Sequence, residues 1–258
     1  MNVYPVTPIG VQEVVSAVAG VCANRDAHKR CGLAPPHFVI RLDAGNGQTT
    51  VTRFIAETFA QNGLRRFGGL DLFLEYTLDG TLPQMRQVFA DIDACAVYTN
   101  GFEGVVAVDI TALSEYVEEE QAAFFLEGIE KVGRSATVIL YTGAAPSRGL
   151  SSLVERFKSA ARSVCDIRPG AYTPEELARI AERQLDKYSV ALEGYEELHG
   201  ALCDVMRARG CRTVKHAAAV VEAAVKAADF SHFVPALSAA QLKSAFADVF
   251  AHEKEEAR

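Results

Sequence analysis

Apolar residues recur along this chain at two different spacings, which predict helices separated by short buried strands. The first helix is expected between residues 11 and 31, where apolar side chains return every three or four positions before the turn-prone stretch GLAPP. These side chains are Val11, Val14, Val15, Val18 and Cys22. The run HFVIRL at 37–42 is short and mainly apolar, as expected of a buried strand. A glycine-containing loop and a helix-patterned segment ending at Gly63 follow, so the order is strand, loop, helix.

The later chain continues this alternation and then changes to helices alone. Strand candidates are LDLFLEY at 70–76, EGVVAVDI at 103–110 and SATVILYTG at 135–143, separated by helix-patterned segments. Strands that alternate with helices predict a mostly parallel sheet with helices on both faces. From Tyr172 onward only helices are expected, beginning with TPEELARIAERQLDKY, whose threonine cap, early proline and glutamates are typical of a helix start.

The expected fold class is therefore α/β, a parallel sheet flanked by helices and followed by an all-helical subdomain. We expect three parts: an N-terminal helical segment at 1–36, an α/β core at 37–170 and the helical subdomain at 171–258.

Composition and charge narrow the classes of function. The 258 residues are 49% hydrophobic and 23% charged, which is ordinary for a globular protein. The net charge of −7 and the pI near 5.4 make nucleic acid an unexpected partner, although a local basic groove stays open. No apolar run is long enough to span a membrane and no signal-peptide pattern is present, so no membrane partner and a cytoplasmic location are expected.

The six cysteines do not predict a metal site. They are scattered, without a CxxC pair or a histidine in metal-ligand spacing, and we expect free buried thiols. They are Cys22, Cys31, Cys95, Cys165, Cys203 and Cys211.

The loop DAGNGQTT partly matches the phosphate-binding pattern G-x-x-x-x-G-K-[S/T]. In that pattern backbone N–H groups and the helix N-terminus hold phosphates, the lysine neutralises charge and the hydroxyl binds magnesium. Leu42 stands in place of the first glycine and Gln48 in place of the lysine. The loop therefore has two interpretations, a phosphate site or a plain connection. As a phosphate site, its candidate residues are Gly45, Asn46, Gly47, Gln48, Thr49 and Thr50.

The substitution at Gln48 predicts weak binding of ATP or ADP. Glutamine donates hydrogen bonds but carries no charge, and losing one buried charge–phosphate contact costs about 2–5 kcal/mol. At about 1.4 kcal/mol per tenfold change, a micromolar affinity weakens to roughly 30 μM or beyond.

The strand VVAVDI carries the second candidate chemistry. Asp109 at its end is a candidate ligand of Mg²⁺ together with Thr49, and the alternative is a strand that merely ends at an aspartate. Ile110 follows where a P-loop ATPase would carry the glutamate that polarises the attacking water. Isoleucine cannot accept a proton, and losing a general base typically costs about 10²- to 10⁴-fold in rate.

Over almost its whole length the chain resembles the AAA+ family of stage V sporulation protein K and the red-type rubisco activases. The resemblance begins in VQEVVSAVAGVCANRDAHKRCGLAPPHFVI, continues through GNGQTTVTRFIAETF, and includes VVAVDI, ATVILYTGA and the lid entry TPEEL. It implies a P-loop AAA+ core with a helical lid, ATP or ADP with Mg²⁺ as ligands, and assembly into a ring. The departures from the family are Gln48 and Ile110, the places of the Walker A lysine and the Walker B glutamate.

The resemblance also implies roles for single residues. Thr142 matches the polar sensor, Arg156 the arginine finger and Arg212 the second sensor of the lid. Each has a plainer interpretation: a strand-forming threonine, a solvated arginine, and a lid stretch whose register is one residue short. Val154 replaces a further family arginine. Tyr76 matches the region of the pore loop, with packing against the core as the alternative.

These observations favour a degenerate AAA+ protein with weak or no ATP hydrolysis, acting as a non-catalytic or regulatory subunit. Asp109 and Arg156 would remain of the catalytic set, and the partner would be a second copy or an active relative in a ring, with an unknown protein client. One alternative is an active ATPase that remodels or loads a protein partner, with Glu103 or Glu115 as the base. The other is a nucleotide-free scaffold, for which Leu42 is expected to crowd the phosphate path.

Overall fold

A computed structural model of the chain describes residues 5–65, 73–98, 103–113, 118–231 and 234–251. The chain forms two compact units, Met1–Pro169 and Gly170–Arg258. The N-terminal helices belong to the first unit, where α1 packs against α3.

The first unit contains one five-stranded parallel sheet in the order β2-β3-β4-β1-β5. Four of its strands overlap the segments expected from the sequence. The fifth, β5, was not expected, because VCDI is short and has a charged residue inside it. The strands are β1 (His37–Ile40), β2 (Phe73–Thr77), β3 (Val105–Asp109), β4 (Thr137–Tyr141) and β5 (Val164–Ile167).

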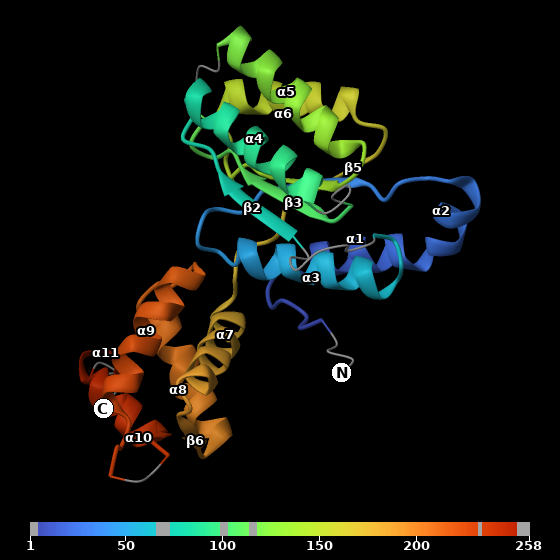
Figure 1. The fold of residues 1–258 in the computed structure, drawn as a ribbon. Coiled ribbons are helices and arrows are strands. Elements are labelled where there is room, and N and C mark those ends of the chain that lie inside the picture. The colour runs from blue at the N-terminus through green and yellow to red at the C-terminus, as the bar shows by residue number, and fades with distance from the viewer. Residues whose placement is uncertain (1–4, 66–72, 99–102, 114–117, 232–233, 252–258) are drawn as a thin grey trace. The chain divides into compact units, whose positions relative to one another are not determined.

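Helices cover both faces of this sheet, as the alternating pattern predicts (Figure 1). Helices α1 and α3 lie on one face, and α4, α5 and α6 lie on the other. The single helix expected at 11–31 is two helices, because the chain turns at Asn24. The helices are α1 (Gln12–Ala23), α2 (Arg25–Cys31), α3 (Gln48–Gln61), α4 (Leu82–Tyr98), α5 (Glu119–Gly133) and α6 (Arg148–Ala160).

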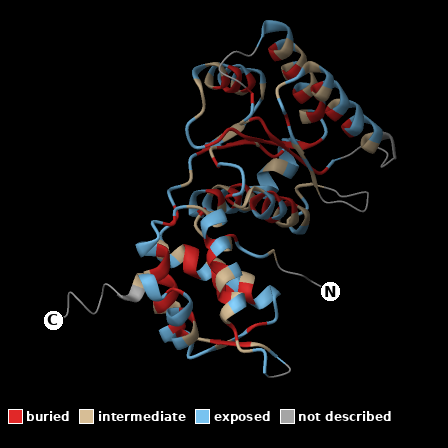
Figure 2. Ribbon diagram, turned by 90° about the vertical axis from the view of Figure 1, so that its left-hand side faces the viewer, coloured by how far each residue is buried: buried red, intermediate tan, exposed pale blue. Residues whose placement is uncertain are grey.

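Side chains of the central strands alternate between two hydrophobic cores. In β3, Val105 and Ala107 pack with α1 and α3, whereas Val106 and Val108 pack with α4, α5 and α6. Strands β3 and β4 are buried along their whole length, as Figure 2 shows in red. Burial on both faces accounts for their nearly continuous apolar sequences.

The second unit is helical with one addition to the expectation. Its helices are α7 (Pro174–Lys187), α8 (Tyr195–Ala208), α9 (Val214–Ala227), α10 (Ala239–Ala245) and α11 (Ala247–Ala251). Helix α7 begins as expected, with Thr173 and Glu176 in a reciprocal cap and Pro174 in the first turn. The expectation of helices alone was wrong in one detail, because β6 (Ala191–Glu193) and β7 (Ala236–Ser238) form a short parallel pair.

A buried acid joins α7 to α8 in this unit. Glu182 is 8% exposed, its Oε1 lies 2.6 Å from His199 Nδ1, and its Oε2 accepts a hydrogen bond from the Tyr195 hydroxyl at 3.0 Å. His199 Nε2 in turn lies 3.5 Å from Cys203 Sγ. From the sequence we expected no histidine in metal-ligand spacing with a cysteine, but His199 lies four residues before Cys203 on α8.

The six thiols are free, but only part of the expectation of burial is confirmed. Cys203 and Cys211 are buried, Cys31 is exposed, and the other three are intermediate. Among the described residues, no group of three or more histidine, cysteine or acidic side chains could hold a metal ion. In the same part of the chain, no helix is both long enough and apolar enough to cross a membrane.

The start of β1 contains a half-buried histidine that is neutral at ordinary pH. His37 Nδ1 accepts a hydrogen bond from the backbone N–H of Val138 at 3.1 Å, and its ring centroid lies 5.9 Å from that of Phe157. Burial, with a smaller contribution from the nearby Arg65 cation, lowers the pKa of His37 from 6.5 to about 4. Protonation would break the bond from Val138.

We predict that this histidine makes the first unit less stable in acid. Between pH 6.5 and 4 the unfolded chain binds the proton and the folded chain does not, so stability falls as pH falls through this window. The loss reaches about 3 kcal/mol near pH 4. Thermal unfolding followed by circular dichroism should show a smaller pH dependence for His37→Gln than for the wild type. The exposed His216→Gln serves as control, and an unchanged pH dependence in His37→Gln would contradict the assignment.

Candidate functional site

The loop between β1 and α3 has the backbone expected of a phosphate-binding turn. Gly45 and Gly47 have φ angles of 83° and 86°, a left-handed conformation that glycine adopts without strain. Helix α3 begins at Gln48, and its N-cap residue is Gly47, which has no side chain to cap the helix. The first N–H groups of a helix have no partner inside it, and its dipole favours an anion there. Thr49 and Thr50 lie exposed in this first turn.

Gln48, in place of the lysine, bonds to the loop itself. Its side-chain Nε2 donates a hydrogen bond to the carbonyl oxygen of Leu42 at 2.9 Å. Leu42 is 5% exposed, and its side chain packs in the core with α1 and α3. The expectation that Leu42 crowds the phosphate path was therefore wrong, because the side chain is turned away into the core.

Two buried hydroxyl groups form hydrogen bonds to the backbone at the start of α3. The Tyr141 hydroxyl, at the end of β4, donates to the carbonyl oxygen of Gln48 at 2.9 Å, and Thr52 Oγ1 reaches the same carbonyl at 3.1 Å. The two hydroxyl oxygens lie 2.9 Å apart. Burial raises the pKa of Tyr141 far above its ordinary value, so the group is a neutral donor. Sequence reasoning missed this pair, because tyrosine and threonine there read as ordinary strand and helix residues.

Asp109 lies at the carboxyl end of β3 and is 4% exposed. Its Oδ1 accepts hydrogen bonds from the backbone N–H of Thr111, at 2.9 Å, and from the Thr111 hydroxyl. These donors orient the carboxylate and stabilise its charge. The neighbouring strand end holds Thr142, which is 2% exposed and donates its backbone N–H to the Ile40 carbonyl at 3.2 Å.

Because Gly143 has no side chain, the loops that follow β1, β3 and β4 can approach one another closely. A Cβ at this position would lie 3.1 Å from Thr111 Cγ2 and 3.2 Å from Asp43 Oδ1, at a φ of 73°. Asp43 Oδ1 also accepts a hydrogen bond from the backbone N–H of Ala144 at 2.8 Å. The structure thus gathers the glycine loop between β1 and α3, Asp109 and Thr142 at the edge formed by the carboxyl ends of β1, β3 and β4. Ligands of open α/β sheets bind at such an edge.

The residues at this edge fit a nucleotide with Mg²⁺, because they offer oxygen atoms of the kind that bind this ion. Mg²⁺ is usually held by one or two protein oxygens together with phosphates and water, and Thr49 and Asp109 would be those oxygens. Thr49 follows the loop directly, and Asp109 ends the strand next to β4.

Ile110 belongs to the core rather than to this edge. It is fully buried and packs with α4, α5 and α6, while its backbone N–H donates to the Tyr141 carbonyl at 2.9 Å. Glu103, one candidate for a replacement base, precedes β3 and lies at the opposite end of that strand from Asp109. That proposal was wrong for this reason, and Glu115 lies outside the described residues.

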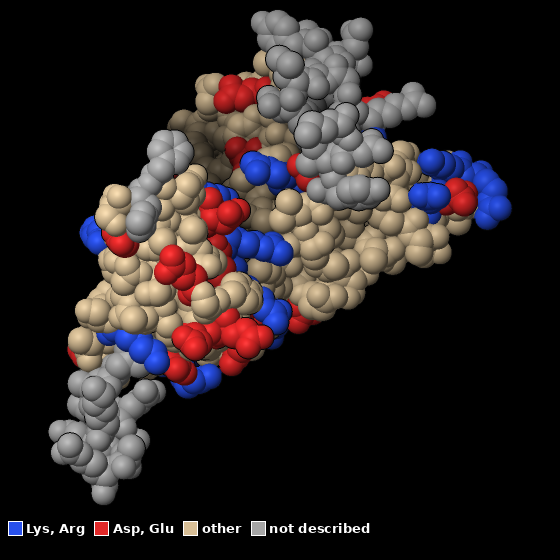
Figure 3. All heavy atoms as spheres, turned by 90° about the horizontal axis from the view of Figure 1, so that it is seen from below, with Lys and Arg blue, Asp and Glu red and all other residues tan. Residues whose placement is uncertain are grey.

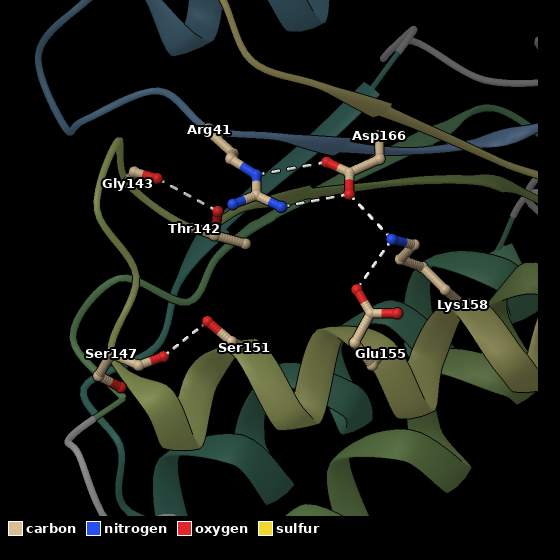
Figure 4. Close-up of polar contacts among 8 residues, drawn as sticks. All are labelled: Arg41, Thr142, Gly143, Ser147, Ser151, Glu155, Lys158 and Asp166. Carbon is tan, nitrogen blue, oxygen red and sulfur yellow. Dashed lines mark hydrogen bonds and ion pairs between the residues drawn. The ribbon is translucent and has the colours of Figure 1, made fainter.

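An ion network includes Arg41, the residue that directly precedes the glycine loop, and it was not predicted from the sequence (Figure 4). Arg41, which directly precedes the loop, donates from Nε and from a terminal nitrogen to the two oxygens of Asp166 at 3.4 and 3.3 Å. Lys158 donates to the same carboxylate and to Glu155, both at 2.9 Å. Partial burial raises the pKa of Asp166, but the bonds from Lys158 and Arg41 outweigh it and lower that pKa overall.

Three other residues singled out in the sequence lie elsewhere. Arg156, on α6, makes a two-pronged ion pair with Glu119 at 3.0 and 3.1 Å, so the structure does not bring it to the loop. Arg212 is exposed in the second unit, where its backbone N–H donates to His216. Tyr76 lies inside β2 and packs against the α4 side of the sheet, in agreement with its interpretation as a core residue.

Comparison with known proteins supports the architecture. No family model and no curated protein matches the chain. Among solved structures, it is similar to the Holliday junction branch migration motor RuvB of Thermotoga maritima, with 18% identity and a TM-score of 0.55 over 93% of this chain and 70% of that chain. A mutant of that protein gives 17% identity and a TM-score of 0.57 over the same shares. PCH-2 of C. elegans gives 10% identity and a TM-score of 0.52, over 94% of this chain and 69% of that chain.

RuvB and PCH-2 are AAA+ proteins, and identities this low show the fold alone. The chain therefore has the AAA+ fold, a P-loop parallel sheet flanked by helices and followed by a helical subdomain.

Proposed function

We propose that this chain is a degenerate AAA+ subunit that binds nucleotide weakly and hydrolyses it slowly or not at all. The observation that carries the proposal is that the side chains at both substituted positions make structural contacts within the fold. Gln48 is bonded to the Leu42 carbonyl, and Ile110 is buried in the core. Neither position offers a charge or a base to a nucleotide.

The remaining groups support binding without turnover. The N-terminus of α3 and the glycine turn are suited to phosphates, and Thr49 and Asp109 are suited to Mg²⁺. Hydrolysis also needs a group that orients the attacking water, and Ile110 cannot do so. An active ATPase is the second candidate, favoured by the retained Asp109. The nucleotide-free scaffold loses the support of Leu42, whose side chain lies in the core.

The proposed role is that of a non-catalytic or regulatory member of a ring, together with further copies or with an active relative. Arg156 would then act on the nucleotide of a neighbouring subunit. Its pair with Glu119 is solvent-exposed, and exposed pairs contribute only about 0–1 kcal/mol, so the arginine is readily released. We also retain Arg212 as a nucleotide contact of the helical subdomain, within the proposed kinship to stage V sporulation protein K and the red-type rubisco activases.

The net charge of −7 and the face drawn in Figure 3 favour a protein client over nucleic acid. In Figure 3, Lys and Arg side chains gather at α2, a seven-residue helix that carries Arg25, Lys29 and Arg30. Elsewhere on the visible face, basic and acidic side chains are mixed. Broad binding to phosphate backbones needs a larger basic face. A cytoplasmic location remains part of the proposal.

We predict that the wild-type chain binds fluorescent ATP and ADP analogues with Mg²⁺ but releases little or no phosphate. Gln48→Lys should tighten ATP binding by about tenfold or more, because it restores the charge. Gln48→Met is the matched control: it removes the amide without adding charge and should give no gain. Turnover in the wild type that Asp109→Ala abolishes would show an active ATPase and contradict the proposal.

We also predict that the missing glutamate cannot be restored by a single substitution. Ile110→Glu places a carboxylate in the core and should lower the free energy of unfolding by at least about 3 kcal/mol. Ile110→Val, the control, should cost about 0.5–1.5 kcal/mol. Both are measured by denaturant unfolding. A stable Ile110→Glu variant with phosphate release would mean that this side chain reaches the site.

A further inference from the structure

The loop at 42–47, the proposed phosphate site, is followed by Gln48 in place of a lysine, but the residue before it, Arg41, is a cation. Strands β1 and β4 pair Ile40 with Tyr141. The residues that follow these two, Arg41 and Thr142, are therefore neighbours as well. Paired side chains of parallel neighbours point to the same face of the sheet. Ile40 and Tyr141 share the core of α1 and α3, and Arg41 and Thr142 therefore share the opposite face. Figure 4 shows the guanidinium reaching over this face toward Asp166, with Thr142 at its other side.

Asp166, the present partner of Arg41, has a second cationic partner and does not need Arg41 to balance its charge. The two bonds from Arg41 to Asp166 are 3.3 and 3.4 Å long, whereas charge-assisted bonds are usually about 2.7–2.9 Å. Lys158 contacts the same carboxylate at 2.9 Å. If Arg41 moves away, Asp166 keeps a cation and is not left as an unpaired, partly buried charge. The Arg41 side chain is 25% exposed, so it has room to change rotamer.

We propose that Arg41 replaces the missing lysine, and that its guanidinium leaves Asp166 to pair with the terminal phosphate of a nucleoside di- or triphosphate. The inference rests on the proposed function, because it assigns the cation of that same phosphate site. A planar guanidinium suits a phosphate, to which it donates two parallel hydrogen bonds. In this arrangement Asp166 and the nucleotide compete for one arginine. Lys158 makes the exchange inexpensive.

This competition predicts effects of opposite sign at the two ends of one ion pair. Arg41→Gln should weaken ATP binding by about tenfold or more, because a charge–phosphate contact is lost. Asp166→Asn should tighten ATP binding, because Arg41 is freed. If the pair only stabilised the fold, both substitutions would act in the same direction. Arg41→Lys, which keeps the charge but not the fork, should give an intermediate affinity.

The test is titration of ATP, ADP and AMP into the full chain and its variants with Mg²⁺, with thermal unfolding to verify folding. Lys131→Gln is the control for charge, because it removes one cation from an exposed pair with Asp93 and should leave affinity unchanged. The effect of Arg41→Gln should be larger for ATP and ADP than for AMP. In the Gln48→Lys background it should shrink, since the restored lysine supplies the charge.

The outcomes separate this inference from the proposed function. Equal ATP affinities in the wild type and a folded Arg41→Gln variant would overturn the role of Arg41 and leave a weakly binding, non-hydrolysing subunit. Weaker binding in both Arg41→Gln and Asp166→Asn would overturn it as well. Phosphate release by the wild type at the rate of an active ATPase, abolished by Asp109→Ala, would instead overturn the proposed function, whatever the Arg41 variants show.

Discussion

Strand β1 is the constraint on which the candidate site depends. It is hydrogen-bonded to β4 on one side and to β5 on the other, all in parallel, so three strands end at one edge. Its alternation sends Leu42 into the core with α1 and α3, and it sends Arg41 to the opposite face. A shift of one residue would exchange these faces. Hydrophobic burial along the strand therefore decides which polar groups are available at its end.

The sequence predicted the order of the elements in the first unit and brought attention to the strand ends at which the candidate site lies. Strand, glycine turn and helix could be recognised because glycines and apolar spacing are local signals, and the strand ending at Asp109 could be recognised for the same reason. The fifth strand, VCDI, was missed because only its pairing with β1 makes it a strand. The pair of β6 and β7 joins residues more than forty positions apart, which no local pattern reveals.

The interior of the site was less predictable, since it depends on contacts between distant residues. Tyr141 and Gln48 lie 93 positions apart in the sequence and share one hydrogen bond. Arg41 and Asp166 are 125 positions apart. The departure of Gln48 from the lysine of the phosphate-binding pattern could be seen in the sequence, but the bond from the Gln48 amide to Leu42 could not. The substitution is therefore more than a deletion of charge, because the new side chain has a structural partner of its own.

Under the proposed function, Gln48 and Ile110 illustrate two ways in which a catalytic position can be absorbed into a fold. The glutamine remains polar and half-buried at the loop, and its bond is made to a backbone carbonyl. The isoleucine is surrounded by apolar side chains from α4, α5 and α6. The first position is open to a change of charge at little cost, whereas the second has become part of the hydrophobic interior.

The hydroxyl pair under α3 has a consequence for the thermodynamics of any ligand that binds the loop. Tyr141 and Thr52 hold the first turn of the helix through the Gln48 carbonyl, and the Gln48 amide closes the loop from the other side. The backbone is thus ordered before a ligand arrives, and binding need not offset the loss of loop entropy. Weak binding at this site would accordingly reflect the contacts that Gln48 does not make, and not a cost of ordering the loop.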